Sequence, residues 1–452
     1  MCPVTRAPGP VDMQYETRGD VGFKSAVDAL LPASYVLLPQ MNQIYELELA
    51  YNEYRCLTDD ELVARGAYFR SVDGIETNHF RMCLSTPDQV NATASKSRKD
   101  FFAANVFAVG YATHGLFPYR GKFHPQMIRA VMNVMGLKPG QTVLDPMAGC
   151  GTTAIEATIM GIDSIAVELS PFACLMTRAK VGALDLDCSS FAGLESRADG
   201  LLQALAPTEE RPVYQPGLFV GLERRTGTEV SIGEMAPALQ ELLTLCYLDA
   251  VGYAVRRKNK SPRDLFPDLL GRYLAAVKAF SESREALGLT LGHAEVMCGD
   301  ARKLDLRDRS VDGILFSPPY SFAIDYVEND RPQLQRLGVD VDGLKRDMVG
   351  LAGTGRSRDE LIQSRLRHYF SDMEAIMRQC LRVLKPGRCC VIVIGSNTNQ
   401  TGGVPLEQGL IEIGRKIGMP LEFQINREIE GIRNTMRDEF LLFFRKPNSL
   451  ES

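Results

Sequence analysis

Two short segments contain the residue types that can bind a ligand and position an amine. The first reads Leu144-Asp-Pro-Met-Ala-Gly-Cys-Gly-Thr-Thr. Asp145 ends an apolar run, Gly149 and Gly151 form a turn, and a helical stretch begins with Thr152 and Thr153. Because glycine has no side chain, a ligand can approach the backbone of such a turn closely. The segment therefore predicts a ligand-binding turn between a strand and a helix.

An acidic residue after the next apolar run narrows the kind of ligand. Glu168 ends that run, 23 residues after Asp145 (168 − 145). An acid about 20 residues beyond a glycine turn is placed to bind ribose hydroxyls. A diphosphate would be repelled by Asp145 and would favour a third glycine, whereas a cation could pair with this acid. The two acids therefore favour a nucleoside with a positively charged appendage, such as S-adenosylmethionine.

The second segment, Ile314-Leu-Phe-Ser-Pro-Pro-Tyr, suits an exocyclic amino group. Pro318 and Pro319 lack backbone N–H donors, so the carbonyl groups around them are left to accept hydrogen bonds. Ser317 Oγ and the Pro318 carbonyl could both accept from one NH2 group, and Tyr320 offers a ring face to a flat base. The alternative interpretation is a rigid Pro-Pro turn without a chemical role.

Seven short apolar runs form the framework that would position these residues. Helical patterns separate most of them, which indicates βαβ units and a mostly parallel, doubly wound α/β sheet. The predicted strands cover residues 142–145, 164–168, 294–298, 313–316, 389–394, 421–425 and 440–444.

The spacing of the strands also predicts the domain organisation. Roughly 120 residues separate the second strand from the third, far more than a usual crossover needs. Two helical stretches, Met235–Tyr253 and Asp264–Phe280, fall in this gap. We therefore expect an N-terminal extension of unknown role, with short helices at 35–38 and 44–51 and a polar linker at 95–100, and a helical insertion. The expected boundaries are 1–105 for the extension, 181–292 for the insertion, and 106–180 with 293–452 for the α/β domain.

Composition limits the function further. The formal net charge is −5, from 51 basic and 56 acidic residues, which excludes coating of nucleic acid by bulk positive charge but not a local basic groove. No apolar run is long enough to span a membrane, and the N-terminus lacks a signal-peptide pattern, so we expect a cytoplasmic location. The 11 cysteines and five histidines are scattered without C-x-x-C spacing, so no metal site is predicted.

Basic residues that could contact nucleic acid, or simply form solvated faces, are Arg256, Arg257, Lys258 and Lys260 in the insertion, and Arg356 and Arg358 in a predicted loop at 328–368.

The two segments together resemble the amino-methyltransferases that modify N4 of cytosine or N6 of adenine in DNA. The resemblance extends to residues 113–126, Gly299-Asp300, Ala323–Tyr326 and Arg382–Gly387, and it covers roughly residues 110–180 and 293–446. It implies a seven-stranded, Rossmann-like methyltransferase sheet and S-adenosylmethionine as the cofactor. It also implies cofactor contacts from Lys122 and Phe123, a ribose contact from Glu168, an adenine contact from Asp300, and a turn at Gly149 and Gly151 around the methionine part.

The resemblance implies direct in-line attack by an amine on the sulfonium methyl, with a flipped-out base stacked on Tyr320 and held by Ser317 and Pro318. The sequence contains no Pro-Cys pair of the kind that C5-cytosine methylation uses. Ser-Pro-Pro-Tyr is typical of the cytosine-N4 members, which makes DNA cytosine the favoured target. Adenine-N6 methylation of DNA remains an alternative. An RNA amino-methyltransferase, for example for guanine-N2 in tRNA, remains another, because enzymes of that kind also have the cofactor turn before the catalytic segment. A nucleic-acid-binding protein without activity and a small-molecule or protein amine methyltransferase also remain open, as does a cognate restriction enzyme as partner.

Overall fold

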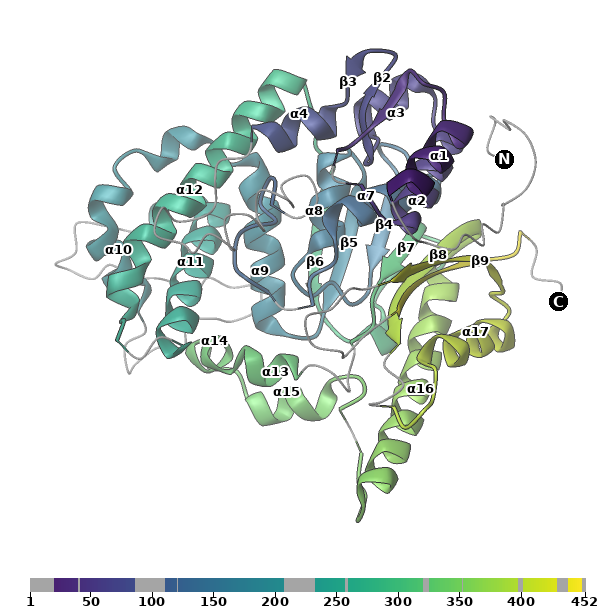
Figure 1. The fold of residues 1–452 in the computed structure, drawn as a ribbon. Coiled ribbons are helices and arrows are strands. Elements are labelled where there is room, and N and C mark those ends of the chain that lie inside the picture. The colour runs from purple at the N-terminus through teal and green to yellow at the C-terminus, as the bar shows by residue number, and fades with distance from the viewer. Residues whose placement is uncertain are drawn as a thin grey trace.

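One large sheet forms the centre of the computed structural model (Figure 1). Its seven strands lie in the order β6-β5-β4-β7-β8-β10-β9, and only β10 runs antiparallel to its neighbours. The strands are β4 (Thr142–Asp145), β5 (Asp163–Glu168), β6 (Ala294–Cys298), β7 (Val311–Phe316), β8 (Leu384–Ser396), β9 (Leu421–Glu428) and β10 (Asp438–Arg445). All seven predicted strands and the doubly wound α/β fold are thereby confirmed. The structure describes residues 20–39, 41–85, 110–119, 121–206, 232–256, 259–319, 325–351, 353–396, 401–428 and 438–448.

The strand order reverses beside β4. The chain passes from β4 outward to β5 and β6, then returns to place β7 on the other side of β4. In an open parallel sheet, ligands bind outside the carboxyl ends of the strands at such a reversal. The glycine turn after β4 and the Ser-Pro-Pro segment after β7 both lie at this edge.

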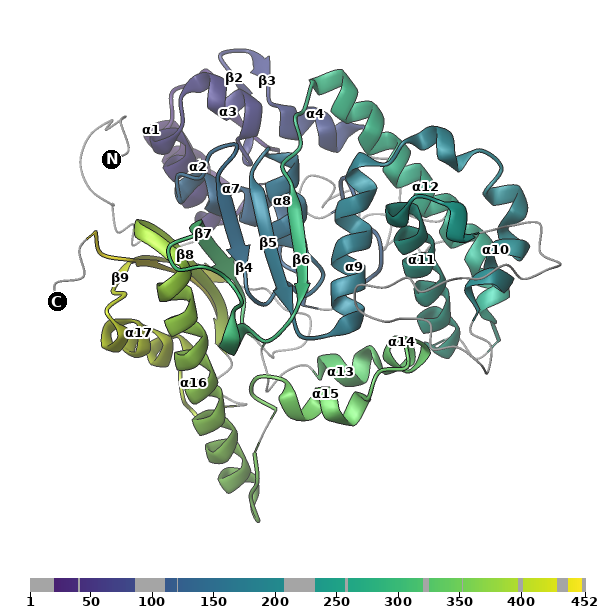
Figure 2. The same cartoon turned by 180° about the vertical axis from the view of Figure 1, so that it is seen from behind.

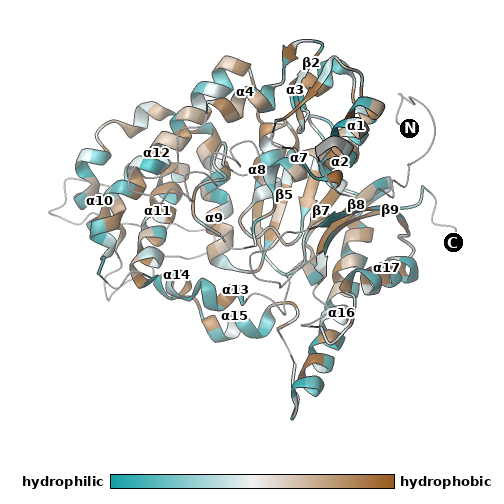
Figure 3. Cartoon of the chain, viewed as in Figure 1, coloured by the Kyte–Doolittle hydropathy of each residue, from teal (hydrophilic) through white to brown (hydrophobic). Residues whose placement is uncertain are grey.

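Helices cover both faces of the sheet, and alternating strand residues point to the two sides. On one face, Leu315 and Val391 pack against α7; on the other, Ile314 and Ile392 pack against α16 and α17. Figure 3 shows hydrophobic colours along the central strands and hydrophilic residues on the outer faces of the surrounding helices. The helices are α7 (Pro125–Val134), α8 (Thr152–Ile159), α16 (Arg358–Val383) and α17 (Leu406–Ile417).

The described part of the segment between β5 and β6 is largely helical, as predicted. Its helices form a hydrophobic cluster with α9, beside the β6 end of the sheet (Figures 1 and 2). Ser261 caps the longest of them, and Gly288 ends it in a left-handed conformation with φ 61°. The helices are α9 (Pro171–Gly182), α10 (Ala198–Leu205), α11 (Pro237–Arg256) and α12 (Pro262–Leu287). The boundaries of an insertion domain remain a prediction.

The N-terminal region folds against α7 and β9. Its three strands form a small antiparallel sheet, so the helix predicted at 35–38 is wrong: Tyr35–Leu37 is a strand paired with β2. The run is too short for a stable helix and is held by its partner strand. The elements are α1 (Asp20–Leu30), β1 (Tyr35–Leu37), α2 (Ile44–Cys56), α3 (Asp59–Arg65), β2 (Phe69–Val72), β3 (Ile75–Glu76) and α4 (Asn78–Leu84). The linker predicted at 95–100 lies outside the described residues.

The described residues contain neither a helix suited to a membrane nor a cluster of metal ligands. None of the described helices combines the length and apolar character that a membrane crossing requires. In the same part of the chain, no group of three or more histidine, cysteine, aspartate or glutamate side chains could hold a metal ion.

Candidate active site

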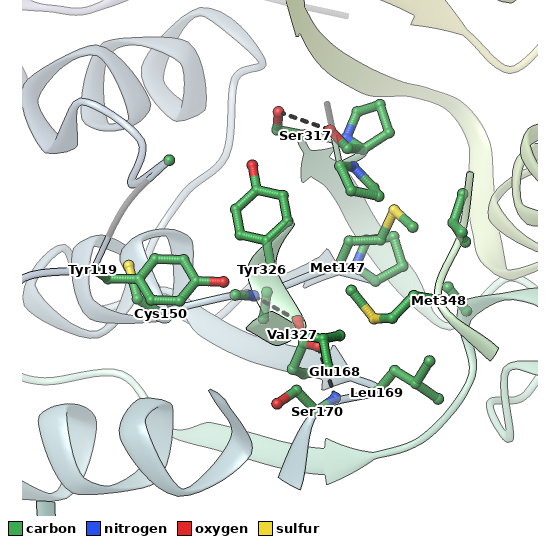
Figure 4. Close-up of a pocket in the computed structure, with 18 of the residues that line it drawn as sticks. Tyr119, Met147, Cys150, Glu168, Leu169, Ser170, Ser317, Tyr326, Val327 and Met348 are labelled. Atoms are coloured by element: carbon green, nitrogen blue, oxygen red, sulfur yellow. Dashed lines mark hydrogen bonds between the residues drawn. The ribbon is translucent and has the colours of Figure 1, made fainter. Parts of the chain in front are cut away.

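A cleft opens at the carboxyl ends of β4, β5, β6 and β7 (Figure 4). Its empty volume is about 1000 Å³, the open mouth included. Figure 4 shows Ser317 and the adjoining prolines at one end and Glu168 with Ser170 at the other. The two segments predicted to do chemistry therefore share one cleft.

The turn after β4 requires glycine for two reasons. Gly149 and Gly151 have φ values of 53° and 81°, in the left-handed region that favours glycine. A Cβ atom on Gly151 would lie 2.7 Å from Cγ2 of Thr177 on α9. Thr177 Oγ1 donates a hydrogen bond of 3.2 Å to the Gly149 carbonyl. The turn is thus fixed against α9, while Gly149, Cys150 and Thr152 line the cleft.

Glu168 connects this turn to the end of β5. Its Oε2 accepts a hydrogen bond of 2.8 Å from the Gly149 N–H, and its Oε1 accepts one of 2.9 Å from the Ser170 N–H. Burial raises the pKa of Glu168, and the backbone N–H donors partly offset that effect. Each oxygen retains a lone pair for a ligand. The carboxylate therefore lines the cleft in a fixed orientation.

Asp145 and Thr153 lie behind the turn and do not line the cleft. Both are buried, and Asp145 Oδ1 accepts a hydrogen bond of 3.1 Å from the Met147 N–H. Burial raises the pKa of Asp145 to about 7. In this structure Asp145 supports the turn, rather than facing the space where a cation would bind.

Asp300 lines the cleft after β6 but already has a protein partner. Its Oδ1 accepts hydrogen bonds of 2.9 Å from both the backbone N–H and Nε of Arg302. Arg302 also contacts Asp372 of α16 at 3.1 Å. This chain of ion pairs fixes the Asp300 carboxylate, which is still 32% exposed.

Ser317, Pro318 and Pro319 line the cleft where β7 ends. Ser317 Oγ donates to the Pro318 carbonyl at 3.5 Å, so these two oxygens lie close together (Figure 4). Two neighbouring oxygens at that separation can bind the two N–H groups of one amine. Tyr320, the predicted stacking residue, lies outside the described residues.

Lys122 and Phe123 also line the cleft, from the segment before α7. Lys122 Nζ donates a hydrogen bond of 2.8 Å to the His114 carbonyl. Burial, together with the charge of Lys180, lowers the pKa of Lys122 to about 8. Lys122 therefore anchors its own segment beside the cleft.

Buried ionic contacts hold the same segment to α8. His114 Nε2 lies 2.7 Å from Glu156 Oε1, and Arg129 Nε donates to Glu156 Oε2 at 2.8 Å. Burial lowers the pKa of His114 to about 4, so this ring is neutral near pH 7. His114 thus has a structural role in this segment.

One wall of the cleft was missed by sequence reasoning. Residues 328–368 were expected to form a loop, and this prediction is wrong: most of them are helical, in α13 (Tyr326–Asn329), α14 (Arg331–Arg336), α15 (Val341–Asp347) and the start of α16. This wall contributes Tyr326, Val327, Asp330, Leu334, Asp347, Met348 and Val349 to the cleft.

Two contacts place this wall against the rest of the cleft. The rings of Tyr119 and Tyr326 stack with centroids 6.2 Å apart. A Cβ atom on Gly121 would lie 2.8 Å from the Tyr326 hydroxyl, so glycine permits the close approach. Helix-start signals could have revealed the wall, because Asp325, Asp340 and Ser357 each cap one of its helices.

Asp330 is the most unusual residue of this wall. Burial and the nearby charge of Glu168 raise its pKa to about 7, and Arg256 partly offsets the effect. Among the described residues, none donates a hydrogen bond to its side chain. The cleft thus contains a carboxyl group that is available to a ligand.

The predicted nucleic-acid contacts lie outside the cleft lining. Arg256 ends α11 and covers the ring of Tyr253 at 4.9 Å, and Lys260 is exposed nearby. Arg356 and Arg358 are exposed at the start of α16. Arg257 and Lys258 lie outside the described residues.

The cleft fits S-adenosylmethionine by the chemistry of its lining. The glycine turn leaves backbone exposed, Glu168 and Asp330 offer acceptors for hydroxyl or cationic groups, and Met147 and Met348 add apolar surface. The strand order of the sheet, the glycine turn after β4 and the acidic residues that line the cleft together define a nucleoside-binding α/β domain of the methyltransferase class.

Comparison with known proteins agrees with this class. Residues 116–214 match the family described as RMKL-like, methyltransferase domain. A 73-residue segment is 38% identical to the type II methyltransferase M.MjaII of Methanocaldococcus jannaschii, covering 16% of this chain and 14% of that protein. A 53-residue segment is 36% identical to the tRNA (guanine(10)-N2)-dimethyltransferase of Methanothermobacter thermautotrophicus, covering 12% and 16%. The chain therefore carries a methyltransferase domain of the S-adenosylmethionine-dependent class, although each alignment spans under a fifth of the relative's length.

One solved structure also aligns with this protein. The crystal structure of a SAM-dependent methyltransferase from Methanosarcina mazei aligns with a TM-score of 0.31 and 11% identity, over 69% of this chain and 95% of that one.

Proposed function

We propose that this protein transfers a methyl group from S-adenosylmethionine to an exocyclic amine of a nucleic-acid base, with N4 of cytosine in DNA as the favoured target. The observation that carries the proposal is the pair of oxygens at the end of β7. Ser317 Oγ and the Pro318 carbonyl lie 3.5 Å apart in the same cleft as Glu168 and the glycine turn. That pair can bind both N–H groups of one amine.

The bound cofactor would supply an electrophilic sulfonium methyl group. The Ser317 and Pro318 oxygens would accept the two N–H hydrogen bonds of the target amine, which directs the nitrogen lone pair at that group in line. As the N–CH3 bond forms, the S–CH3 bond would break, S-adenosylhomocysteine would leave, and the methylated amine would release one proton to water. Glu168 would bind the ribose, Asp300 the adenine, and Lys122 with Phe123 the cofactor side that faces α7. The target base would leave the duplex to enter the cleft and stack on Tyr320.

An RNA substrate remains the second candidate because of the relatives. The Methanocaldococcus relative is named as a type II methyltransferase, which supports DNA modification beside a restriction enzyme. The Methanothermobacter relative is named as a tRNA guanine-N2 dimethyltransferase, which supports RNA. Ser317 and its neighbours favour cytosine, whereas neither alignment spans enough of the relative to decide between the two polymers.

Mass spectrometry of nucleosides tests the proposal directly. Purified protein is incubated with isotope-labelled S-adenosylmethionine and either genomic DNA or total tRNA, and the digested nucleosides are analysed. We expect label on N4-methylcytosine from DNA. Label on N6-methyladenine or on N2-methylguanine would move the target to the corresponding alternative, and no label in any nucleoside would overturn the proposal.

Replacing Ser317 with alanine tests the catalytic assignment. Loss of one acceptor should lower turnover by about 10²–10³-fold, in the range measured for removal of one positioned hydrogen-bonding group. The Kd for S-adenosylmethionine, measured by calorimetry, should change less than threefold. Unchanged turnover in the Ser317→Ala variant would remove Ser317 from the mechanism.

A further inference from the structure

A projecting arm beside the cleft has no role in the chemistry proposed above. It consists of residues 353–368, which form the loop before α16 and the first three turns of that helix. Figures 1 and 2 show this end of α16 extending beyond the sheet, away from α17. The arm begins four residues after Val349, which lines the cleft. The lip of the cleft thus leads directly into the arm.

Close packing gives the arm a defined shape. The loop folds back along the helix: the Thr354 N–H donates to Ser364 Oγ at 3.2 Å, and the Arg356 N–H donates to Glu360 Oε2 at 2.8 Å. A Cβ atom on Gly355 would lie 2.3 Å from the Leu361 backbone nitrogen. The loop therefore needs glycine in order to approach the helix this closely.

The arm contains four arginines without an ion pair to any described residue, three of them exposed, whereas Arg365 is half-buried with its Nε atom enclosed. Arg356, Arg358, Arg365 and Arg367 form no ion pair with any described residue. Further along the same helix, by contrast, Arg378 pairs with Glu374 at 2.8 Å, and Arg382 pairs with Asp308 at 2.8 Å. Positive charge is therefore left unpaired only toward the projecting end of α16.

Three of these arginines lie on the side of the helix that carries the loop. Arg358 and Arg365 are seven residues apart, about two turns, and so share one face. Arg356 is in the loop itself, and a Cβ atom on Gly353 would lie 2.6 Å from Cγ of Arg365. Arg367 points about 160° away from Arg365, given 100° per residue. The first turn of α16 also carries Asp359 and Glu360, which offset the positive amide end of the helix, so the excess charge on the loop side comes from the three arginines.

The basic residues of the helical insertion are a weaker candidate for the same role. Arg256 covers the ring of Tyr253, and it also acts on the acids Asp249 and Asp330. Arg263 pairs with Asp199 at 3.2 Å. Much of this charge is thus already balanced within the protein.

We propose that Arg356, Arg358 and Arg365 bind the phosphate backbone of the nucleic acid next to the target nucleotide. This inference rests on the proposed function, because a base bound in the cleft places its flanking phosphates at the lip. The planar guanidinium group binds phosphate through two parallel hydrogen bonds, and such contacts fix the register of a nucleic acid without reading its sequence. The arm therefore supplies affinity and position, and the cleft supplies chemistry.

The salt dependence of binding tests the arm. Binding of a fluorescent 20-base-pair duplex to the R356Q/R358Q/R365Q variant is measured by anisotropy from 50 to 200 mM salt. Loss of three phosphate contacts should reduce the slope of log K against log salt by about 2.7, since each contact contributes about 0.9. A single-stranded substrate should show about 0.7 per contact. Circular dichroism and the Kd for S-adenosylmethionine should match those of the wild type.

Two matched controls isolate the position of the charge. Arg367→Gln removes an unpaired arginine from the opposite face, and Arg378→Gln removes a paired one from the same helix; each should change the slope by less than about 0.3. Gly355→Ala keeps every charge but displaces the loop, so it should weaken duplex binding severalfold. An unchanged slope in the triple variant would overturn the inference. It would also be overturned if Arg367→Gln changed the slope by as much, for each charge removed, as the triple variant does.

The outcomes also separate the arm from the proposed function. A wild-type protein that methylates nucleosides, combined with an unaffected triple variant, would overturn the arm alone. A wild-type protein that binds duplex through the arm but labels no nucleoside would overturn the proposed function alone. If the arm instead binds an acidic protein, the nucleic-acid slope stays unchanged in the triple variant, which again counts against the inference.

Discussion

Asp330 places a second carboxyl group near Glu168 in the cleft, and its ionisation should control cofactor affinity. Its pKa is raised to about 7, so it is neutral below that pH and negative above it. S-adenosylmethionine carries a net positive charge, and its affinity should therefore rise roughly threefold to tenfold between pH 6 and pH 8. In the Asp330→Asn variant, the part of the rise that Asp330 causes should disappear. Any part caused by Asp145, whose pKa is also raised to about 7, should remain. Calorimetry at several pH values measures the affinity.

The neutral product provides the control for this prediction. S-adenosylhomocysteine lacks the sulfonium charge, so Asp330 should affect its affinity less over the same pH range. An equal pH dependence for the two ligands, or for wild type and Asp330→Asn, would show that the Asp330 charge does not act on the cofactor.

Glu156 is the residue on which the buried contacts of α8 depend. It is fully buried between Arg129 and His114, and the Arg129 charge holds its pKa near 2 despite burial. Glu156→Gln leaves the Arg129 charge unpaired and should lower the free energy of unfolding by about 3–5 kcal/mol at pH 7. The double variant R129M/E156L should cost less, because it leaves no buried charge. Urea unfolding compares the three proteins.

The same residue gives a pH dependence with a definite sign. The pKa of Glu156 is lower in the folded protein than its ordinary value of 4.5, so its contribution to stability is fully present above pH 4.5. It is lost as the pH falls from about 4.5 to about 2. The stability difference between wild type and Glu156→Gln should shrink over that range, and a constant difference would contradict the assignment.

At the scale of elements, the start of α8 requires glycine at position 151 for two reasons, its left-handed backbone conformation and the close packing of Thr177 against it. Both Gly151 and Gly140 have φ near 80°, but a Cβ atom would overlap Thr177 only at Gly151, since Gly140 has open space. Gly140→Ala should cost about 1–2 kcal/mol of unfolding free energy, the penalty of the left-handed conformation. Gly151→Ala should cost at least about 1 kcal/mol more and weaken cofactor binding as well. Equal effects on both measurements would contradict the packing argument.

The elements also show which parts of the fold follow from local sequence. The central strands could be predicted because they are short apolar runs buried on both faces, as in β7, where all six residues are buried. The edge strands β6 and β9 are only partly buried, yet each still contains a short apolar run. The cleft wall could not be recognised in the same way. Its helices are four to seven residues long, too short for a clear period, and they are stabilised by capping and by packing on α11.

In the candidate site too, the residues at strand ends could be predicted from the sequence, whereas those positioned by packing could not. Glu168, Asp300 and Ser317 were predictable because each follows a strand whose carboxyl end must lie at the ligand edge. Asp145 precedes the turn in sequence but faces the interior, and Asp330 reaches the cleft only through the fold of the wall. Neither position could be derived from spacing.

On the scale of the whole molecule, buried polar contacts join the N-terminal region to the α/β domain. Glu53 of α2 accepts hydrogen bonds from the Ala67 N–H at 3.0 Å and from Asn133 Nδ2 of α7 at 2.6 Å. Asn133→Ala leaves Glu53 short of a donor and should cost about 1–3 kcal/mol of unfolding free energy. We expect the two regions to unfold together, because this contact lies inside one continuous hydrophobic cluster.

The absence of tryptophan from the sequence allows a direct measurement of that coupling. Tyr51→Trp reports on α2, and Phe440→Trp reports on β10. Both probes should give the same urea midpoint, and Asn133→Ala should lower both equally. Earlier unfolding at the Tyr51→Trp probe would show that the N-terminal region is an independent unit.

The contact between the N-terminal region and β9 has a consequence for synthesis. Arg427 of β9 lies over the ring of Tyr45 of α2 at 5.1 Å, although 382 residues separate them (427 − 45). At about 5–20 residues per second, a ribosome needs roughly 20–75 s to make the intervening chain. During that interval α2 can pack against α7 but lacks its contact with β9, so the packing of the N-terminal region is completed only when translation of the sheet is almost finished.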